Sequence, residues 1–173
     1  MMIQTDRLIL RELTPEDFAA LHKVLTDPAI MQHYPYAFDD ARVKGWIERN
    51  RERYNIFGFG LWAVCLKETG EMIGDCGLTM QLIGNTIKPE IGYHIRADHQ
   101  RKGYATEAAK AVRDWTFEYT PFNTVYSYMK YTNEPSIKTA LAYGCKKVDE
   151  FADEVNEVTV VCAITREEWA KMR

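Results

Sequence analysis

The residues best suited to chemistry form one run, Gln-Arg-Lys-Gly-Tyr-Ala at positions 100–105. A strand-like apolar run precedes it, and apolar residues recur at helical spacing after it. At a helix start the first backbone N–H groups lack intrahelical partners and the helix dipole adds positive charge, so a phosphate can accept several hydrogen bonds. Gly103 leaves room for the ligand, and Arg101 and Lys102 add positive charge. The run therefore predicts a phosphate-binding turn; the alternative is a basic turn that only starts a helix.

The rest of the chain must supply the elements that position this turn. Periodicity, glycine and proline positions and capping patterns predict strands and helices along its whole length. We expect strands at residues 6–12, 61–67, 72–81, 89–96, 125–131, 145–150 and 158–164, and helices at residues 14–26, 39–54, 104–119 and 133–144. Thr165 and Glu168 match a capping box that opens a short C-terminal helix. This order predicts a mixed α/β fold in which helices flank a central sheet.

Composition and charge narrow the class of protein. A chain of 173 residues with 46% hydrophobic and 27% charged residues fits one globular domain over residues 1–173. The net charge of −3 argues against a nucleic-acid partner, because phosphate backbones are bound by concentrated positive charge. No stretch approaches the length of a membrane span and the N-terminus lacks an export signal, so we expect no membrane contact and a cytoplasmic location.

The four cysteines, Cys65, Cys76, Cys145 and Cys162, are widely spaced and form no pattern with the four histidines. Such a distribution is typical of buried free thiols in a reducing compartment and not of a disulfide framework or a metal site. We therefore expect no bound metal.

Taken together, the order of elements and the run at 100–105 resemble the GNAT N-acetyltransferase superfamily, whose acyl-CoA signature Q/R-x-x-G-x-G/A lies at this strand-to-helix turn. The segments TDRLILR at 5–11 and EIGY at 90–93, with the pair Asn133 and Ser136, look like its ribosomal-protein-acetyltransferase subgroup. The resemblance covers nearly the whole chain. It implies a central, mostly antiparallel sheet that is splayed at the acyl-CoA site and flanked by helices.

The same resemblance implies acetyl-CoA as the co-substrate. The backbone N–H groups of residues 101–106 would hold the CoA pyrophosphate, and the strand edge at 93–95 would pair with the pantetheine amides as an added strand does. The expected cofactor-binding residues are Tyr93, His94, Ile95, Arg101, Lys102, Gly103, Tyr104, Ala105, Thr106 and Asn133. Asn133 is equally well explained as a helix N-cap.

The implied reaction is direct attack of an amine on the acetyl thioester in a ternary complex, and the attacking nitrogen must be neutral. Glu90 is the expected general base, because burial can raise the pKa of a carboxyl group toward neutral pH. The alternative for Glu90 is a strand-edge carboxylate that faces solvent. His94, at the same strand parity, is a second candidate base.

The departing thiolate benefits from a hydrogen-bond donor. Many members of the superfamily have a tyrosine for this purpose, but Ala140 stands at the matching position. Ser136 is the expected donor by resemblance. Tyr143 could take this part only if the helix brings it back toward the sulfur.

The expected acceptor is a primary amine, either a protein N-terminus or a small molecule. The aromatic segment at residues 31–36 is a candidate wall of the acceptor site or simply a flap over the core. Asp39, Asp40 and Asp75, with Glu90, could form an acidic entrance or ordinary solvated surface. The alternative function is a non-catalytic acyl-CoA-binding module, and a homodimer is possible because exposed strand edges can pair.

Overall fold

The computed structural model describes residues 1–173, in which one eight-stranded sheet carries helices on both faces. The strands are β1 (Met2–Gln4), β2 (Leu8–Arg11), β3 (Leu61–Leu66), β4 (Met72–Ile83), β5 (Thr86–Ile95), β6 (Thr124–Lys130), β7 (Lys146–Asp153) and β8 (Glu157–Thr165). The helices are α1 (Phe18–Leu25), α2 (Pro28–Met31), α3 (Asp40–Phe57), α4 (Tyr104–Tyr119), α5 (Glu134–Ala142) and α6 (Arg166–Ala170), with short 3₁₀ turns at Pro15–Asp17 and Ala97–His99. None of these helices combines the length and the apolar character that crossing a lipid bilayer requires.

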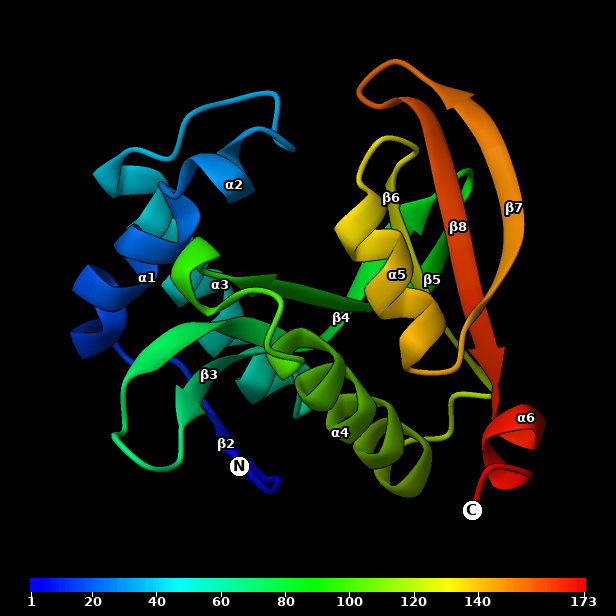
Figure 1. Ribbon diagram of the computed structural model, residues 1–173, viewed down its shortest axis with the longest axis horizontal. Coiled ribbons are helices and arrows are strands. Elements are labelled where there is room, and N and C mark those ends of the chain that lie inside the picture. Colours follow the sequence, from blue (N-terminus) through cyan, green and yellow to red (C-terminus); the bar gives the residue numbers. More distant parts are fainter.

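The sheet consists of two antiparallel parts. Its order is β1-β2-β3-β4-β5-β6-β8-β7, and every neighbouring pair is antiparallel except β5 and β6. In Figure 1, β5 and β6 run side by side near the middle, and β8 and β7 complete the right-hand side. The predicted mixed, mostly antiparallel sheet with flanking helices is confirmed.

Side chains alternate between the two faces of the sheet, and each face has its own helices. Trp62 and Val64 of β3 pack in the larger core cluster with residues of α4. Ala63 and Cys65, at the opposite parity, pack in a second cluster with residues of α1 and α3. Figure 1 accordingly shows α4 and α5 in front of the sheet, with α1 to α3 gathered toward its left side. We call these the α4–α5 face and the α1–α3 face.

The junction between the two parts is narrow, because β5 and β6 share only the pair Glu90 and Tyr126. One residue further along, the Ser127 hydroxyl donates to the Ile91 carbonyl at 2.7 Å and takes a second hydrogen bond of 2.7 Å from the Tyr143 hydroxyl. The Ser127 side chain thus takes the place of a backbone N–H of β6 as the donor to the Ile91 carbonyl. Beyond this point β5 and β6 separate.

We expect Ser127→Ala to destabilise the fold through this junction. Ser127 is 1% exposed, so its removal leaves the Ile91 carbonyl and the Tyr143 hydroxyl buried without partners. Unsatisfied buried groups cost about 1–3 kcal/mol each, so the two together should cost about 2–6 kcal/mol and lower Tm by roughly 4–24 °C in a chain of this size. Thermal melts of Ser127→Ala, Tyr143→Phe and the double variant check this: the two effects should be non-additive, and full additivity would contradict a shared hydrogen bond.

Most predicted elements are present, and the N-terminus differs. The predicted strand at 6–12 begins at Leu8, and β1, which was not predicted, pairs with it. Thr5 makes the turn between them, since its backbone N–H donates to the Leu8 carbonyl and its hydroxyl accepts from the Leu8 N–H at 2.9 Å. The second predicted helix extends to Phe57 and ends at Gly58, whose φ of 78° suits glycine. The four cysteines are buried free thiols, as expected.

Candidate active site

The turn at residues 100–105 has the predicted strand-to-helix geometry. Arg101 and Gly103 both have positive φ, 61° and 83°, and α4 begins at the next residue, Tyr104. The first α-helical hydrogen bond runs from Glu107 N–H to the Gly103 carbonyl at 3.0 Å, so the preceding N–H groups have no helical acceptor. Arg101, Lys102 and Gly103 are all exposed. The turn presents backbone donors and two cations to solvent, as an anion-binding site requires.

Contacts on both sides fix the turn in place. Gln100 donates from Nε2 to the Ile95 carbonyl at 2.7 Å. Arg7 donates to the Lys102 carbonyl at 2.9 Å, pairs with Glu107 at 2.7 Å and lies over the Tyr104 ring. Arg7 was not singled out in the sequence, because nothing local shows that the β1–β2 turn packs on the start of α4. These bonds leave the outward side of the turn free for a ligand.

The edge of β5 is open where β6 moves away. Arg96 N–H donates to the Ile73 carbonyl, so by the alternation of an antiparallel ladder His94 and Gly92 also pair with β4. The backbone groups of Tyr93 and Ile95 then point away from β4, and those of His94 do not. The Ile95 carbonyl already accepts from Gln100, so Ile95 offers its N–H to the gap. Of the three strand residues expected to pair with an extended ligand, two offer their backbone to it.

Ser136 and Asn133 lie at the start of α5, on the α4–α5 face. The Tyr93 hydroxyl donates to the Ser136 carbonyl at 2.7 Å and accepts from Ser136 Oγ at 3.4 Å. Asn133 Oδ1 accepts from Ser136 N–H at 3.3 Å, which is the N-cap interpretation. The cap uses only the amide oxygen, so the amide nitrogen is still available to a ligand. Tyr143 is fully buried and its hydroxyl bonds to Ser127, so it does not reach the outer side of the gap.

Glu90 lies on the α1–α3 face of β5, and its carboxylate leans along the strand over Gly92. A Cβ at Gly92 would lie 3.1 Å from Glu90 Oε2, so glycine provides the space that the carboxylate occupies. Thr79 Oγ1 donates to the same oxygen at 3.3 Å, and Gln81 Nε2 donates to Thr79 Oγ1 at 3.0 Å. Burial raises the pKa of Glu90 to about 7, with His94, Thr79 and Arg53 opposing the shift. Glu90 is therefore not the solvent-facing edge carboxylate of the alternative interpretation.

His94 belongs to a buried cluster on the same face. Its Nδ1 lies 2.6 Å from Asp75 Oδ1, and its Nε2 lies 2.5 Å from the Tyr34 hydroxyl. Trp46 Nε1 donates to Asp75 Oδ2 at 2.9 Å. Burial alone would lower the pKa of His94, but the charge and hydrogen bond of Asp75 outweigh it and the pKa is raised.

The proposed acidic entrance is wrong in its composition. Asp75 is 0% exposed and bonded within the cluster, and Asp39 caps α3 by accepting from Arg42 N–H at 2.8 Å. Asp39 and Asp40 are both exposed, and Asp40 lies 3.4 Å from His22. Carboxylates that are spread along the sequence had no reason to share a surface, and two of the three have internal partners.

The aromatic segment at 31–36 packs over the same part of the sheet. The Tyr34 ring makes edge-to-face contacts with Phe38 and Trp46, with centroids 5.0 and 6.5 Å apart. It also lies 5.8 Å from the His94 ring. The segment thus packs on the core of the α1–α3 face beside His94, which is the flap interpretation.

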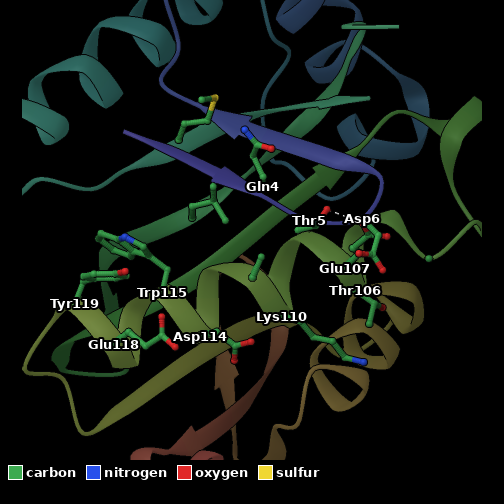
Figure 2. Close-up of a pocket in the computed structure, with 14 residues that line it drawn as sticks. Gln4, Thr5, Asp6, Thr106, Glu107, Lys110, Asp114, Trp115, Glu118 and Tyr119 are labelled. Carbon is green, nitrogen blue, oxygen red and sulfur yellow. Dashed lines mark hydrogen bonds between the residues drawn. The ribbon is translucent and has the colours of Figure 1, made fainter. Parts of the chain in front are cut away.

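A separate open groove of about 820 Å³ runs between the β1 side and α4. Figure 2 shows Gln4 and Thr5 on one side of it, and Lys110 and Trp115 on the other. Glu90, His94 and Ser136 do not line it, although Gly103 and Thr106 of the turn do. The groove therefore shares two residues with the phosphate turn but none with the catalytic candidates at the β5–β6 gap.

The parts of the candidate site meet at this gap. The phosphate turn follows β5 after the short 3₁₀ turn at Ala97–His99, and the open backbone edge precedes it. Glu90 and Ser136 lie on opposite faces of the sheet at the gap. This arrangement suits a ligand with an anionic group, then an extended chain with amides, then a reactive end that passes between the strands.

Comparisons with known proteins agree with this fold. A family model described as the acetyltransferase (GNAT) domain matches residues 7–146. The uncharacterized protein YkkB of Bacillus subtilis (strain 168) is 35% identical over 141 residues, which cover 81% of this chain and 82% of that protein.

Two solved structures illustrate the similarity in three dimensions. An acetyltransferase from Agrobacterium tumefaciens str. C58 has 30% identity and a TM-score of 0.80, with 95% of this chain and 94% of that chain covered. RimL, described as a ribosomal α-N-protein acetyltransferase in complex with coenzyme A, has a TM-score of 0.79 at 16% identity, with coverage of 95% and 98%.

Proposed function

The chain belongs to the GNAT acetyltransferase family, and from that premise we propose that residues 1–173 form one catalytic domain that acetylates a primary amine. The family uses acetyl-CoA, whose thioester supplies an activated acetyl group. The observation that carries the proposal is Glu90, a half-buried carboxyl group with a pKa of about 7 beside the β5–β6 gap.

Acetyl-CoA, the acetyl donor, would lie along the turn at 101–106, the open edge of β5 and the start of α5. The turn at 101–106 would hold the CoA pyrophosphate through its free N–H groups, with Arg101 and Lys102 adding charge. The backbone groups of Tyr93 and the N–H of Ile95 would pair with the pantetheine amides. The side-chain amide nitrogen of Asn133 would donate to the same arm, while its oxygen continues to cap α5.

Glu90 would act as the general base that keeps the attacking nitrogen neutral. At pH 7.4 roughly a quarter of an α-amine is already neutral, but only about a thousandth of a lysine side chain is. A base with a pKa of about 7 is well matched to an α-amine and less well to a lysine. This match favours a protein N-terminus or a small amine of similar basicity as the acceptor.

Ser136 would donate to the departing sulfur from the other side of the gap. Its Oγ makes only a 3.4 Å hydrogen bond to the Tyr93 hydroxyl, so the group can turn toward a ligand without a large loss. Ala140 carries no donor, and the Tyr143 hydroxyl is already bonded to Ser127. Ser136 is therefore the candidate whose hydroxyl is the more available to the sulfur.

Incubation with acetyl-CoA and a panel of amines tests the proposal. The panel should contain peptides with free N-termini, polyamines and aminoglycosides. Release of the CoA thiol is measured first, and the acceptor is then analysed by mass spectrometry. We expect release of free CoA only with the correct acceptor. Binding of CoA without turnover on any amine would support a non-catalytic acyl-CoA-binding module instead.

The position of the Glu90 carboxylate can be tested without replacing Glu90 itself, by a substitution at Gly92. Gly92→Ala would place a Cβ 3.1 Å from Glu90 Oε2, so the carboxylate must shift. A misplaced catalytic group can cost on the order of 100-fold in rate. We expect kcat to fall by about 10- to 100-fold while the dissociation constant of CoA is unchanged, as measured by steady-state kinetics and calorimetry. An unaltered kcat would mean that the position of the Glu90 carboxylate is unimportant.

A further inference from the structure

Asp75, His94 and Tyr34 form a hydrogen-bonded chain that the proposed function does not use. The two links measure 2.6 and 2.5 Å, and Trp46 Nε1 fixes the far oxygen of Asp75 at 2.9 Å. Asp75 is 0% exposed and the His94 side chain is 16% exposed. A fully buried carboxylate is costly unless it is paired, so the arrangement is unlike a chance surface contact.

The chemistry of the groups sets the direction of each hydrogen bond. An ionised carboxylate only accepts, so His94 Nδ1 carries the proton that faces Asp75. In a neutral imidazole Nε2 then accepts, and the Tyr34 hydroxyl donates to it. Burial raises the pKa of Tyr34 well above its usual value, so Tyr34 keeps its proton. The lone pairs of the Tyr34 oxygen are left to accept from another donor.

Glu90 and His94 lie on one face of β5 with only Gly92 between them. Residues two apart on a strand are about 6.5–7 Å apart, and the Glu90 carboxylate already leans over Gly92. An amine nitrogen above Gly92 would therefore have Glu90 on one side and the His94–Tyr34 pair on the other. Because Gly92 has no side chain, it leaves space between Glu90 and His94 for this nitrogen.

We propose that Tyr34, oriented by His94 and Asp75, accepts the second proton that the acceptor nitrogen loses during acetylation. This inference rests on the proposed function. The overall reaction converts an ammonium ion and a thioester into an amide, a thiol and one free proton, so the nitrogen loses two protons. Glu90 takes the first before attack and releases it to solvent.

The second proton leaves as the C–N bond forms and the C–S bond breaks. It passes to the Tyr34 oxygen while the Tyr34 proton moves to His94 Nε2, which leaves an imidazolium paired with Asp75. The departing sulfur takes up one proton from Ser136 or water, and that donor is restored from solvent. His94 then returns its proton to solvent through Tyr34, so the balance closes with one free proton. Tyr34 is the group that touches substrate, and His94 and Asp75 are positioning residues.

Several ionisable groups surround the chain and enter its pH dependence. They come from β5, β6, α3 and the segment between α2 and α3, and they are Glu90, Tyr128, Lys130, Arg53, His33 and Tyr36. His94 accepts a proton only when it is neutral, so its raised pKa makes the rate increase as pH rises through that value. The kcat of the unmodified protein should thus rise with pH through two deprotonations, which we call the Glu90 step and the His94 step.

The test compares kcat against pH for the unmodified protein, Tyr34→Phe and Asp75→Asn, with an amine from the panel that the unmodified protein acetylates. Tyr34→Phe removes the proton-accepting oxygen but keeps the ring contacts with Phe38 and Trp46. We expect kcat to fall on the order of 100-fold and the His94 step to disappear, with the Glu90 step retained. Tyr119→Phe, the same change at a side chain that is 72% exposed on α4, is the control.

Asp75→Asn changes the direction of the hydrogen bonds of His94 while keeping the buried groups paired, so it tests the orientation of His94 and not the stability of the fold. Trp46 Nε1 is only a donor, so the new amide must turn its oxygen to Trp46 and its NH₂ to His94 Nδ1. His94 then carries its proton on Nε2 and donates to Tyr34, so every group is satisfied but Tyr34 can no longer pass its proton on. We expect the same loss of kcat and of the His94 step, and the double variant should be no slower than either single variant.

The outcomes separate this inference from the proposed function. If the unmodified protein acetylates no amine, both fail. If it turns over and Tyr34→Phe retains both pH steps with kcat within about 2-fold, only the relay is overturned. A fall in kcat with both steps intact would also overturn it, because that result indicates that Tyr34 only supports the packing of the site.

Discussion

Replacing Glu90 with glutamine should lower kcat for amine acetylation by about 10²- to 10⁴-fold, the usual contribution of a general base. The amide is nearly isosteric and can still accept from Thr79, so the surrounding hydrogen bonds survive. The CoA turn and the open edge of β5 are untouched, and the dissociation constant of CoA should not change. Steady-state kinetics together with calorimetric CoA titration separates the two effects.

The pH dependence of Glu90→Gln gives a second readout. Glu90 works only when it is deprotonated, so activity of the unmodified protein should rise as pH passes about 7, and this step should vanish in the variant. Burial raises the pKa of Glu90 from its ordinary value of 4.5 to about 7, so the folded protein loses stability as pH rises from 4.5 to about 7 and this group ionises. The variant lacks this cost. Its Tm should match that of the unmodified protein at acidic pH and exceed it at pH 8.

The matched control is Glu52→Gln, an exposed glutamate on α3. It should leave kcat and its pH profile unchanged. If Glu90→Gln kept full activity with the same pH step, another group would have to be the base, and the assignment of Glu90 would fail.

Gly103→Pro should abolish CoA binding. Gly103 has a φ of 83°, and proline is restricted to a φ near −65°. The substitution also removes an N–H at the point where the pyrophosphate would lie. We expect the dissociation constant of CoA to rise at least about 100-fold, which corresponds to about 2.7 kcal/mol.

Two alanine variants separate lost binding from general strain. Gly103→Ala adds a Cβ to a residue with positive φ and should weaken CoA binding by about 10-fold, consistent with a strain of 1–2 kcal/mol. Gly58→Ala carries a similar strain at a φ of 78° at the end of α3, with open space around the new Cβ. It should lower Tm without changing CoA affinity. Retained CoA affinity in Gly103→Pro would refute the pyrophosphate assignment.

Local sequence patterns were sufficient for the elements near the donor site. The apolar stripe from residue 104 onward gave the bounds of α4 as the structure has them, because an amphipathic helix shows its period directly. The glycine turn and the N-cap at Asn133 are also local features. The strand β1 was missed because its three residues, Met-Ile-Gln, are too few to show any alternation.

The acceptor side could not be derived in the same way, because its contacts join distant segments. The Asp75–His94 contact depends on the β4–β5 register, and Tyr34 reaches His94 across 60 positions. A single sequence shows which side chains can ionise, but only the fold shows that Asp75 is buried beside His94 and not exposed at an entrance. The same holds for Ser127, whose bond to the Ile91 carbonyl explains why β5 and β6 separate.

The most direct test of the account is transfer of an isotope-labelled acetyl group from acetyl-CoA. The labelled donor is incubated with the amine panel, and products are separated and sequenced or fragmented by mass spectrometry. The account predicts one label per acceptor, bound as an amide on a primary amine nitrogen, with an equal amount of free CoA and almost no label when Glu90 is glutamine. Label found only in acetate, or none released while CoA remains bound, would contradict it.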